Sequence, residues 1–193
     1  MHTHPHSAFN YNFRTPGSHV EGPIHFAFGQ SSLGTVLVAL SQRGVCAIFL
    51  GEESQELRHQ LAAEFPDIKL QPGRASMNNE LKQVIDFIDK GVTDGVIDLD
   101  IGGTAFQQNV WQVLCGIRAG KTRSYSDVAR DLGRPEAVRA VAGACAANVL
   151  AIAIPCHRLV RRDGSTSGYR WGVERKRALL KEEATEMCVE FSQ

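Results

Sequence analysis

Three runs of β-branched and aromatic residues, joined by short turns that contain glycine, occupy residues 24–50. The runs cover residues 24–28, 35–40 and 45–50. Short apolar runs of this kind indicate strands, and the glycine-containing turns between them are typical of neighbouring antiparallel strands. The stretch therefore predicts a β-meander, which commits this part of the chain to a sheet.

Two amphipathic helices are predicted after the meander. Residues 54–65 carry leucine and phenylalanine on one face at helical spacing, and Pro66 ends the pattern. Residues 78–90 repeat that spacing with leucine, valine and isoleucine, and Gly91 follows as a C-cap signal. Strands and helices around one core make an α+β domain. We expect this domain over residues 23–102, and nothing in it indicates chemistry.

The segments that flank this predicted domain lack a periodic pattern. Residues 1–22 hold four histidines among proline, glycine, serine and asparagine. We expect a disordered tail there, in which alternating histidines bind metal only adventitiously. Residues 94–100 are acidic and polar, and Gly102 and Gly103 mark the expected domain boundary.

The second predicted domain, residues 103–186, is mainly helical. Thr104 and Gln107 form a capping box that begins its first helix. A short helix over residues 126–132 is followed by Gly133 and by a helix over residues 135–148. Helix, short glycine-containing turn and helix is the pattern of a helix-turn-helix. A charged helix is expected over residues 173–184.

The second helix of the predicted helix-turn-helix consists mostly of alanine and glycine. Small side chains let a helix approach another surface closely. That surface is either the protein core or a groove too narrow for ordinary side chains, such as the minor groove of DNA. Arg139 is the one long cation in this helix. It reaches either a DNA groove or Glu136 as a surface ion pair.

The formal net charge of zero conceals an asymmetry between the two predicted domains. Residues 1–103 hold 7 Lys+Arg and 12 Asp+Glu, whereas residues 104–193 hold 14 and 9. A basic half favours a polyanionic partner, because cationic side chains bind phosphates without regard to sequence. An ordinary solvated surface is the alternative that charge alone leaves open.

The five cysteines form no CxxC pair. This argues against a disulfide framework or a cysteine-rich zinc site and fits a reducing compartment. Cys46 falls in a predicted strand and is interpreted as a core thiol. No apolar run is long enough for a membrane span, and the N-terminal residues do not resemble a secretory signal. We expect a cytoplasmic protein that needs no metal.

Cys156 follows an apolar run and Pro155, and it precedes His157 and Arg158. A thiol becomes a strong nucleophile as the thiolate, which cationic or proton-accepting neighbours promote. The alternative is a buried, inert cysteine beside a surface histidine. Residues 167–172 form a glycine-bracketed aromatic loop, which is either an ordinary loop or one wall of a pocket for a flat ligand.

The segment Ile154–Val160 resembles the active-site motif of the O6-alkylguanine-DNA alkyltransferases. Residues 103–108, 137–141 and 167–172 resemble further motifs of this family, in the same order and at similar spacing. The resemblance covers residues 24–184 and is strongest to the carboxy-terminal part of Ada-type members. It implies a ribonuclease H-like N-terminal domain and a C-terminal domain with a winged-helix-like helix-turn-helix.

The resemblance also implies a chemistry. Cys156 takes an alkyl group irreversibly from O6 of guanine, and each molecule acts once. His157 deprotonates Cys156 through a water, and Glu183 orients His157, although the adjacent Glu182 remains an alternative. Tyr125 donates a proton or hydrogen bond to the base. No organic or metal cofactor is implied.

The implied partner is double-stranded DNA that contains O6-alkylguanine, bound by a protein monomer with the target base flipped out of the stack. Whether O4-alkylthymine is also repaired stays open. Arg139 fills the space that the base vacates, and Asn148 braces the link between the helix and the active-site segment. The further residues implied are Arg134, Ala140 and Gly143 at the DNA, and Tyr125, Leu159, Tyr169 and Arg170 around the base.

Three other functions were weighed. A non-catalytic module that binds alkylated DNA lacks the nucleophile, whereas Cys156 is present. A Cys–His hydrolase needs a histidine that faces the cysteine from a distant segment, and His157 is the only histidine in the second half of the chain. A helix-turn-helix regulator needs polar side chains that read bases, which the alanine-rich helix does not provide.

Overall fold

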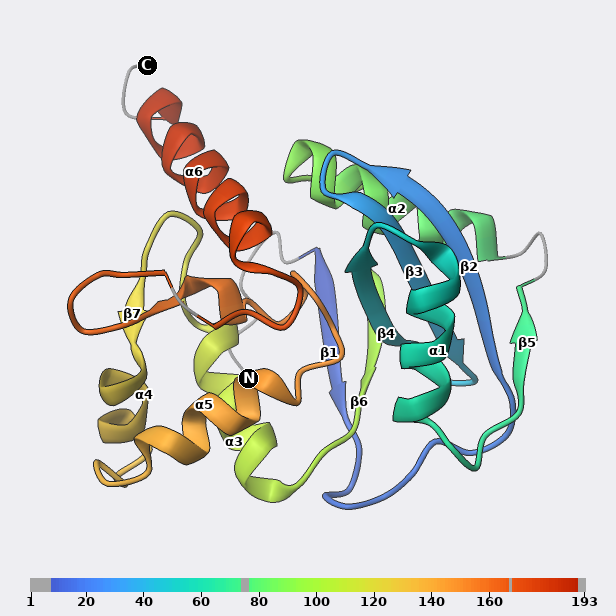
Figure 1. Ribbon diagram of the computed structural model, residues 1–193, viewed down its shortest axis with the longest axis horizontal. Coiled ribbons are helices and arrows are strands. Elements are labelled where there is room, and N and C mark those ends of the chain that lie inside the picture. Colours follow the sequence, from blue (N-terminus) through green and yellow to red (C-terminus); the bar gives the residue numbers. More distant parts are fainter. Residues whose placement is uncertain (1–7, 74–76, 167, 191–193) are drawn as a thin grey trace. The chain divides into compact units, whose positions relative to one another are not determined.

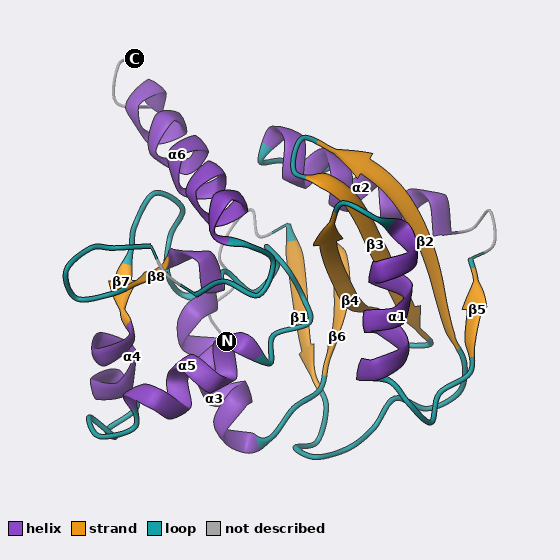
Figure 2. Ribbon diagram, viewed as in Figure 1, coloured by secondary structure: helices purple, strands orange, loops and turns teal. Residues whose placement is uncertain are grey.

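The computed structural model describes residues 8–73, 77–166 and 168–190, with side chains as far as residue 185 in the last helix. The chain divides into two compact units, residues 1–103 and 104–193. Strands are concentrated in the first unit, whereas the second is mostly helix and loop (Figures 1 and 2). The predicted α+β class is confirmed at this level.

A six-stranded mixed sheet forms the first unit, with the strand order β1-β6-β4-β3-β2-β5. The predicted meander is confirmed, because β2, β3 and β4 pair in antiparallel fashion. The outer pairs β1–β6, β4–β6 and β2–β5 are parallel. The strands are β1 (Phe9–Phe13), β2 (Ile24–Ser31), β3 (Gly34–Ser41), β4 (Gly44–Gly51), β5 (Leu70–Pro72) and β6 (Ile97–Ile101).

Helices α1 (Ser54–Glu64) and α2 (Asn78–Lys90) cover opposite faces of this sheet. A Cβ at Gly29 would meet Ile85 of α2 at 2.5 Å, and a Cβ at Gly51 would meet Leu57 of α1 at 2.8 Å. The register pairs Gly29 and Gly51 with adjacent residues of β3, and adjacent residues point to opposite faces. The central strand β4 is therefore buried on both sides.

One expectation for this unit is wrong, and one strand was not anticipated. Phe9–Phe13 lies within the expected disordered tail, yet it forms β1, paired with β6 and held by an edge-on contact between Phe9 and Phe87. Residues 94–100, which the sequence shows only as acidic and polar, contribute their last part to β6. The physical reason is the same in both cases, because each strand is completed by a distant segment. Residues 1–7 lie outside the described part of the chain.

The helices of the second unit are α3 (Ala105–Cys115), α4 (Tyr125–Asp131), α5 (Val138–Ala146) and α6 (Val173–Glu190). The predicted capping box of α3 is present, and α4 has a second one. Trp111 of α3 donates from Nε1 to the carbonyl oxygen of Ala144 in α5 at 3.0 Å. Helix α4, its turn and α5 form the predicted helix–turn–helix arrangement. Helix α6 extends beyond the expected residue 184.

A buried segment, residues 148–155, connects α5 to a short 3-10 helix, η2 (Cys156–Arg158). The chain then enters β8 (Leu159–Val160), which pairs in parallel with β7 (Arg123–Ser124). Ile152 lies in the left-handed region with φ of 61°. This conformation is strained for a β-branched residue by about 1–3 kcal/mol, so the surrounding packing must hold it.

In the part of the chain that the structure describes, none of the helices combines the length and apolar character needed to cross a bilayer.

Candidate active site

Cys156 begins η2 in the second unit and is 4% exposed. Asn148 donates from Nδ2 to its Sγ at 3.3 Å and to the carbonyl oxygen of Ile154 at 3.0 Å. The Oδ1 of Asn148 accepts from the backbone N–H of Leu150 at 2.8 Å. This buried amide therefore ties the end of α5 to the segment that carries the thiol.

His157 follows Cys156 and is also buried. Its Nε2 lies 2.8 Å from Oε1 of Glu183 in α6. Its Nδ1 is buried and has no hydrogen-bond partner among the described residues. Because an ionised carboxylate only accepts, Nε2 carries the hydrogen and Nδ1 keeps a free lone pair. The contact is with Glu183 rather than with Glu182, the alternative that the sequence left open.

Glu183 is held from three directions. Arg158 donates to it from Nη2 at 2.8 Å and from Nε at 3.0 and 3.2 Å. The backbone N–H of Gly120 donates to Oε2 at 3.1 Å. Burial opposes the charged form, but the hydrogen bonds from His157 and Arg158 outweigh it and lower the pKa of Glu183 to about 2. The carboxylate is therefore charged at neutral pH.

Burial dominates the titration of the two central groups. It raises the pKa of Cys156 well above its ordinary value, and the neighbouring thiol of Cys145 adds to the rise, whereas the Asn148 hydrogen bond opposes it. Burial lowers the pKa of His157, although Glu183 opposes this. The thiol of Cys156 and the imidazole of His157 are therefore both neutral at neutral pH.

Sequence reasoning missed two cations near this cluster. Arg158 was noticed only as a neighbour of the thiol, yet it also donates from Nη1 to the carbonyl oxygen of Ile117. Lys176 of α6 is fully buried, and its Nζ donates to the carbonyl oxygen of Leu159. Burial lowers the pKa of Lys176. No sequence signal separates this lysine from the exposed lysine in the same charged helix.

Two tyrosines border the thiol. Tyr125 begins α4, and its hydroxyl donates to the carbonyl oxygen of Gly168 at 3.4 Å. Burial raises the pKa of Tyr125 to about 12, so it is protonated at neutral pH. Burial also raises the pKa of Tyr169, with a further contribution from Cys156. The ring of Tyr169 contacts that of His157 edge-on, with the centroids 6.3 Å apart.

The other residues predicted around a base lie in the same unit but differ in exposure. Leu159 is fully buried. Arg170 is exposed and lies over the ring of Trp171, with its Cζ 5.1 Å from the ring centroid. It also donates to the carbonyl oxygen of Ala146, the last residue of α5, at 3.3 Å.

Several small residues of helix α5 are exposed on its outer face. Arg139, Ala140 and Gly143 are exposed, whereas Val141 and Ala144 are buried. A Cβ at Gly143 would meet nothing within 4 Å. Packing within the protein therefore does not require the small residues of the outer face. The tight-core interpretation of this helix is wrong for that face, which leaves a surface shaped for close approach.

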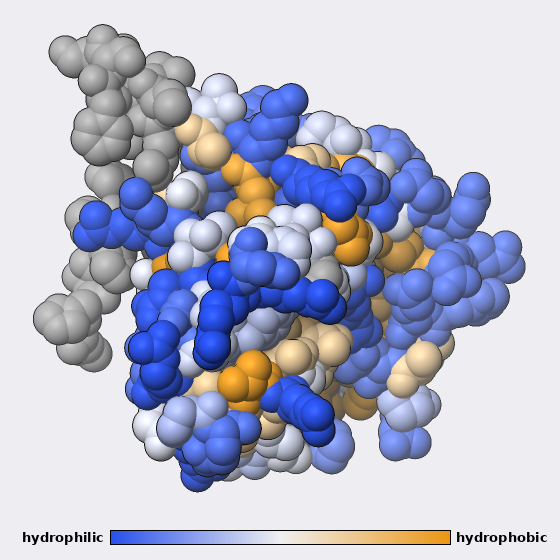
Figure 3. All heavy atoms as spheres, turned by 60° about the vertical axis from the view of Figure 1, so that its left-hand side comes forward, coloured by the Kyte–Doolittle hydropathy of each residue, from blue (hydrophilic) through white to orange (hydrophobic). Residues whose placement is uncertain are grey.

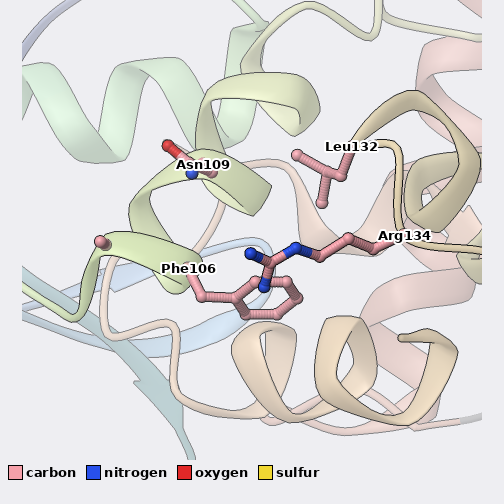
Figure 4. Close-up of a pocket in the computed structure, with 5 residues that line it drawn as sticks. Phe106, Asn109, Leu132 and Arg134 are labelled. Atoms are coloured by element: carbon pink, nitrogen blue, oxygen red, sulfur yellow. The ribbon is translucent and has the colours of Figure 1, made fainter. Parts of the chain in front are cut away.

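Arg134 lies in the turn between α4 and α5 and crosses the ring of Phe106, with its Cζ 5.9 Å from the ring centroid (Figure 4). The two residues border a pocket of about 360 Å³ together with Asn109 and Leu132. The pocket does not include Cys156 among its lining residues. The guanidinium of Arg134 is exposed and belongs to the turn of the helix–turn–helix arrangement.

The described residues contain no group of three or more histidine, cysteine, aspartate and glutamate side chains that could hold a metal ion. Hydrophilic residues cover most of the face shown in Figure 3, and apolar residues are confined to small patches between them. The most exposed large apolar residues that the structure describes, Val92 and Val96, lie in the first unit.

Comparisons with known proteins point to one family. A family model described as the DNA-binding domain of 6-O-methylguanine DNA methyltransferase matches residues 105–185. The regulatory protein Ada of Salmonella typhimurium is 48% identical over 172 residues, which are 89% of this chain and 48% of that protein. The chain thus spans about half the length of this relative.

Two further relatives match along most of their length. An inducible methylated-DNA–protein-cysteine methyltransferase of Bacillus subtilis is 35% identical over 148 residues, which are 74% of this chain and 83% of that protein. The crystal structure of an O6-methylguanine methyltransferase of Mycobacterium tuberculosis is 32% identical, covers 84% of this chain and 93% of that one, and has a TM-score of 0.66. On these matches, the chain belongs to the methylated-DNA–protein-cysteine methyltransferase family.

Proposed function

We propose that the protein repairs DNA by transferring an alkyl group from O6-alkylguanine in duplex DNA to its own Cys156. The observation that carries this proposal is the state of His157, the residue after Cys156: its Nε2 contacts Glu183, and its buried Nδ1 has no partner among the described residues and can accept a proton. The relatives named for methyl transfer from DNA to protein cysteine support it.

The nucleophile is generated at the moment of transfer. Because burial keeps Cys156 protonated, a base must remove its proton as the new bond forms. The lone pair of Nδ1 on His157 takes this proton through a water, and Glu183 stabilises the resulting imidazolium. Arg158 and Gly120 hold Glu183 in place, so both act as positioning residues.

The transfer step balances without a cofactor. A bond forms between Sγ of Cys156 and the alkyl carbon, and the bond between that carbon and O6 breaks with its electron pair remaining on guanine. Tyr125 donates a proton to the base, and its raised pKa of about 12 keeps it protonated until then. Guanine therefore gains its proton from Tyr125, His157 holds the proton that the thiol loses, and solvent exchange afterwards returns a proton to Tyr125 and removes one from His157. The thioether does not revert, so each molecule acts once and no metal is needed.

DNA binding is assigned to the second unit. The outer face of α5, with Ala140 and Gly143, enters the minor groove, and Arg139 fills the space of the flipped base. Arg134 contacts a phosphate. Tyr169, Arg170 and the backbone near Leu159 surround the base. A helix N-terminal to the groove-binding one and the paired strands β7 and β8 support a winged-helix-like description of this unit.

The remaining assignments complete the proposal. Residues 23–102 form a ribonuclease H-like domain, for which the mixed sheet with helices on both faces gives support. Residues 103–186 form the alkyltransferase domain, and the protein acts as a monomer on DNA. A DNA complex of a Mycobacterium tuberculosis relative, with a TM-score of 0.68, supports the DNA partner.

The test is the intact mass of the protein after incubation with a duplex that contains one O6-methylguanine. We expect a gain of one methyl group, mapped to Cys156 by peptide sequencing. Cys156→Ala should show no gain, whereas Cys46→Ala, the matched buried cysteine of the first unit, should gain the methyl group. Binding of the duplex without a mass gain would identify a non-catalytic lesion-binding module and overturn the proposal.

A further inference from the structure

A basic turn follows the reactive segment, and the proposed alkyl transfer does not use it. The turn consists of residues 161–165, which come directly after β8 and are all exposed. The backbone N–H of Arg161 donates to the carbonyl oxygen of Ser165 at 3.0 Å, and that of Gly164 donates to the carbonyl oxygen of Arg161 at 2.9 Å. Gly164 has a φ of 81°, which glycine adopts without strain. The basic turn is therefore tightly closed, and it presents the adjacent side chains of Arg161 and Arg162.

The two guanidinium groups of the basic turn are not used within the described part of the chain. Neither Arg161 nor Arg162 forms a side-chain hydrogen bond or an ion pair with another described residue. The one acid of the turn, Asp163, accepts from the backbone N–H of Ser165 at 2.9 Å. Hydrogen bonds to Ser165 are the main cause of the lowered pKa of Asp163, and the charge of Arg161 contributes less.

Other arginines of the second unit do have acidic partners. The pairs are Arg123 with Asp131, Arg130 with Asp127, Arg158 with Glu183, and Arg177 with Glu174. The basic turn therefore differs from its surroundings, because it carries two neighbouring positive charges that no intramolecular ion pair satisfies.

The two ends of the loop that contains the basic turn are anchored to α4 and α5. Val160, the residue before the turn, pairs with Ser124, the N-cap of α4. After the turn, Arg170 donates to the carbonyl oxygen of Ala146, the last residue of α5, at 3.3 Å. Figure 1 shows that the loop after β8 projects from the second unit beyond β7. The basic turn is thus held near the C-terminal end of α5 but points away from the protein.

Exposed cations consequently lie near both ends of α5. The helix has nine residues, which at 1.5 Å per residue make a length of about 13 Å. Arg134 precedes it and lies over the ring of Phe106. Between the two cationic positions, the outer face of α5 carries Ala140 and Gly143. A minor groove that receives this face has phosphates of the two strands along its edges, so cations at the helix ends are suited to meet them.

We propose that Arg161 and Arg162 form a second DNA-contact surface, which binds neighbouring phosphates of one strand. The inference rests on the proposed function for its partner, duplex DNA, and it adds a contact outside α5. A guanidinium binds phosphate oxygens through two parallel hydrogen bonds, which suits this pair to a phosphate backbone. Contacts of this kind position the protein on the duplex without reading its sequence.

The test is the binding of a labelled duplex that contains no lesion, measured by fluorescence anisotropy over a range of salt concentrations. In Arg161→Gln/Arg162→Gln, we expect the slope of log affinity against log salt to become shallower by about 2, and the affinity at low salt to fall roughly 10-fold. Arg161→Lys/Arg162→Lys keeps both charges and should keep the salt dependence of the wild type.

The matched control is Arg58→Gln/Lys69→Gln, which removes two exposed cations from the first unit. It changes the net charge by the same amount and should leave the affinity and the slope nearly unchanged. Equal losses in the two glutamine variants would show that net charge governs binding and would overturn the proposal. Wild-type affinity and slope in the variant of the basic turn would also overturn it. All four substituted residues are exposed, and thermal unfolding checks that both variants fold.

Methylphosphonate substitution tests the same contact from the DNA side. A neutral methylphosphonate in place of one phosphate should weaken binding of the wild type at two neighbouring positions. The same substitutions should have no effect on Arg161→Gln/Arg162→Gln. If no such positions exist, the proposed contact is wrong.

These measurements are independent of alkyl transfer, because the duplex carries no alkylated base. A protein that shows the expected contacts but never accepts a methyl group would contradict the proposed function alone. A protein that accepts the methyl group but shows no difference between the two glutamine variants would contradict this inference alone.

Discussion

Each unit of the protein buries a cysteine and also holds a carboxylate that is paired with arginine, but the surroundings of the two thiols differ. In the first unit, Cys46 lies near Asp100. In the second, Cys156 precedes His157, which contacts Glu183. No imidazole is found among the described contacts of Cys46 and Asp100. Under the proposed function, this difference decides which thiol can react.

In the first unit, both Asp100 and Cys46 have hydrogen-bond or ion-pair partners within the protein. Asp100 pairs with Arg14 at 3.1 Å and accepts from the hydroxyl of Ser41 at 2.6 Å. The thiol of Cys46 donates to the carbonyl oxygen of Ala39 at 3.4 Å. Burial, followed by the charge of Asp100, raises the pKa of Cys46 to about 12. A carboxylate next to a thiol therefore suppresses the thiolate when no base lies between them.

In the second unit, Cys156 is buried like Cys46, but Nδ1 of the adjacent His157 has no partner among the described residues and can accept a proton. Glu183 acts on the imidazole rather than directly on the thiol, so its negative charge favours proton uptake by His157. Burial raises the pKa of Cys156 as it does that of Cys46. Cys46 and Cys156 are thus both buried, and under the proposed function the free Nδ1 of His157 is what makes Cys156 the reactive one.

The imidazole should have the largest effect that a single substitution outside Cys156 produces. His157→Gln keeps a donor toward Glu183 but removes the basic lone pair. We expect the single-turnover rate of methyl transfer to fall by roughly 100-fold or more. Quenched-flow sampling with intact mass as the readout measures this rate. The exposed His59→Gln is the matched control, and equal rates in the two variants would contradict the role of the base.

Substitutions around Cys46 should change the free energy of unfolding rather than the rate of methyl transfer. Asp100→Asn leaves the buried Arg14 without its counter-charge, which we expect to destabilise the first unit by about 3 kcal/mol. Urea unfolding combined with hydrogen exchange of peptides from residues 8–103 measures this loss. Asp67→Asn, at an exposed position, should be neutral. A slower transfer rate in folded Asp100→Asn would show that the two neighbourhoods are coupled.

The stability of the second unit should depend on pH through Glu183 and His157. The pKa of Glu183 is lowered from 4.5 to about 2 in the folded state, so its contribution is present above pH 4.5 and is lost as the pH falls toward 2. The pKa of His157 is lowered from 6.5, so the unfolded chain takes up this proton first and stability falls as the pH drops below 6.5.

We therefore expect the unfolding free energy of the second unit to fall in two stages on acidification. In Glu183→Gln the stage below pH 4.5 should shrink, by up to about 2 kcal/mol. Denaturant unfolding at several pH values from 7 down to below the lowered pKa of Glu183 measures both stages. The transfer rate should rise with pH through the lowered pKa of His157 and then stay level. A rate that instead rises only near the pKa of a free thiol would refute the neutral-thiol mechanism.

Glycine substitutions give the smallest expected effects, and their signs differ between the units. Gly143→Ala fills open space on α5 and should stabilise the second unit by up to about 1 kcal/mol. The same change should weaken binding to duplex DNA, because the added methyl group obstructs close approach. Gly29→Ala forces a Cβ against Ile85 at 2.5 Å and should destabilise the first unit.

Thermal unfolding and fluorescence anisotropy with a labelled duplex measure the two effects of Gly143→Ala. Unchanged DNA affinity in this variant would remove α5 from the interface. Gly29→Ala should bind DNA with the affinity of the wild type once folded.

Several features were predictable from residues that are close in the chain. The meander and helix α2 follow from periodicity, and the capping box of α3 needs only Thr104 and Gln107. The adjacency of Cys156 and His157 is itself sequence information. Local patterns suffice here because backbone hydrogen bonding within helices and hairpins joins neighbouring residues.

Other features were not predictable in the same way. Strand β1 was taken for part of a disordered tail, because its partner β6 is almost 90 residues away in the register that pairs Phe9 with Ile97. Lys176 lies in a helix that the sequence predicts only as charged, and it is fully buried. Neither residue type nor spacing indicates such positions, since both depend on what the rest of the chain packs against them.

The sequence by itself determined which groups the protein possesses: a thiol beside an imidazole, a helix of small residues and a basic second half. The contact of His157 with Glu183 rather than Glu182, and the support of this carboxylate by Arg158 and Gly120, are visible only in the folded chain. The physical reason is that proton affinities and partners depend on burial and on contacts between distant segments. Those contacts exist only after the helices pack.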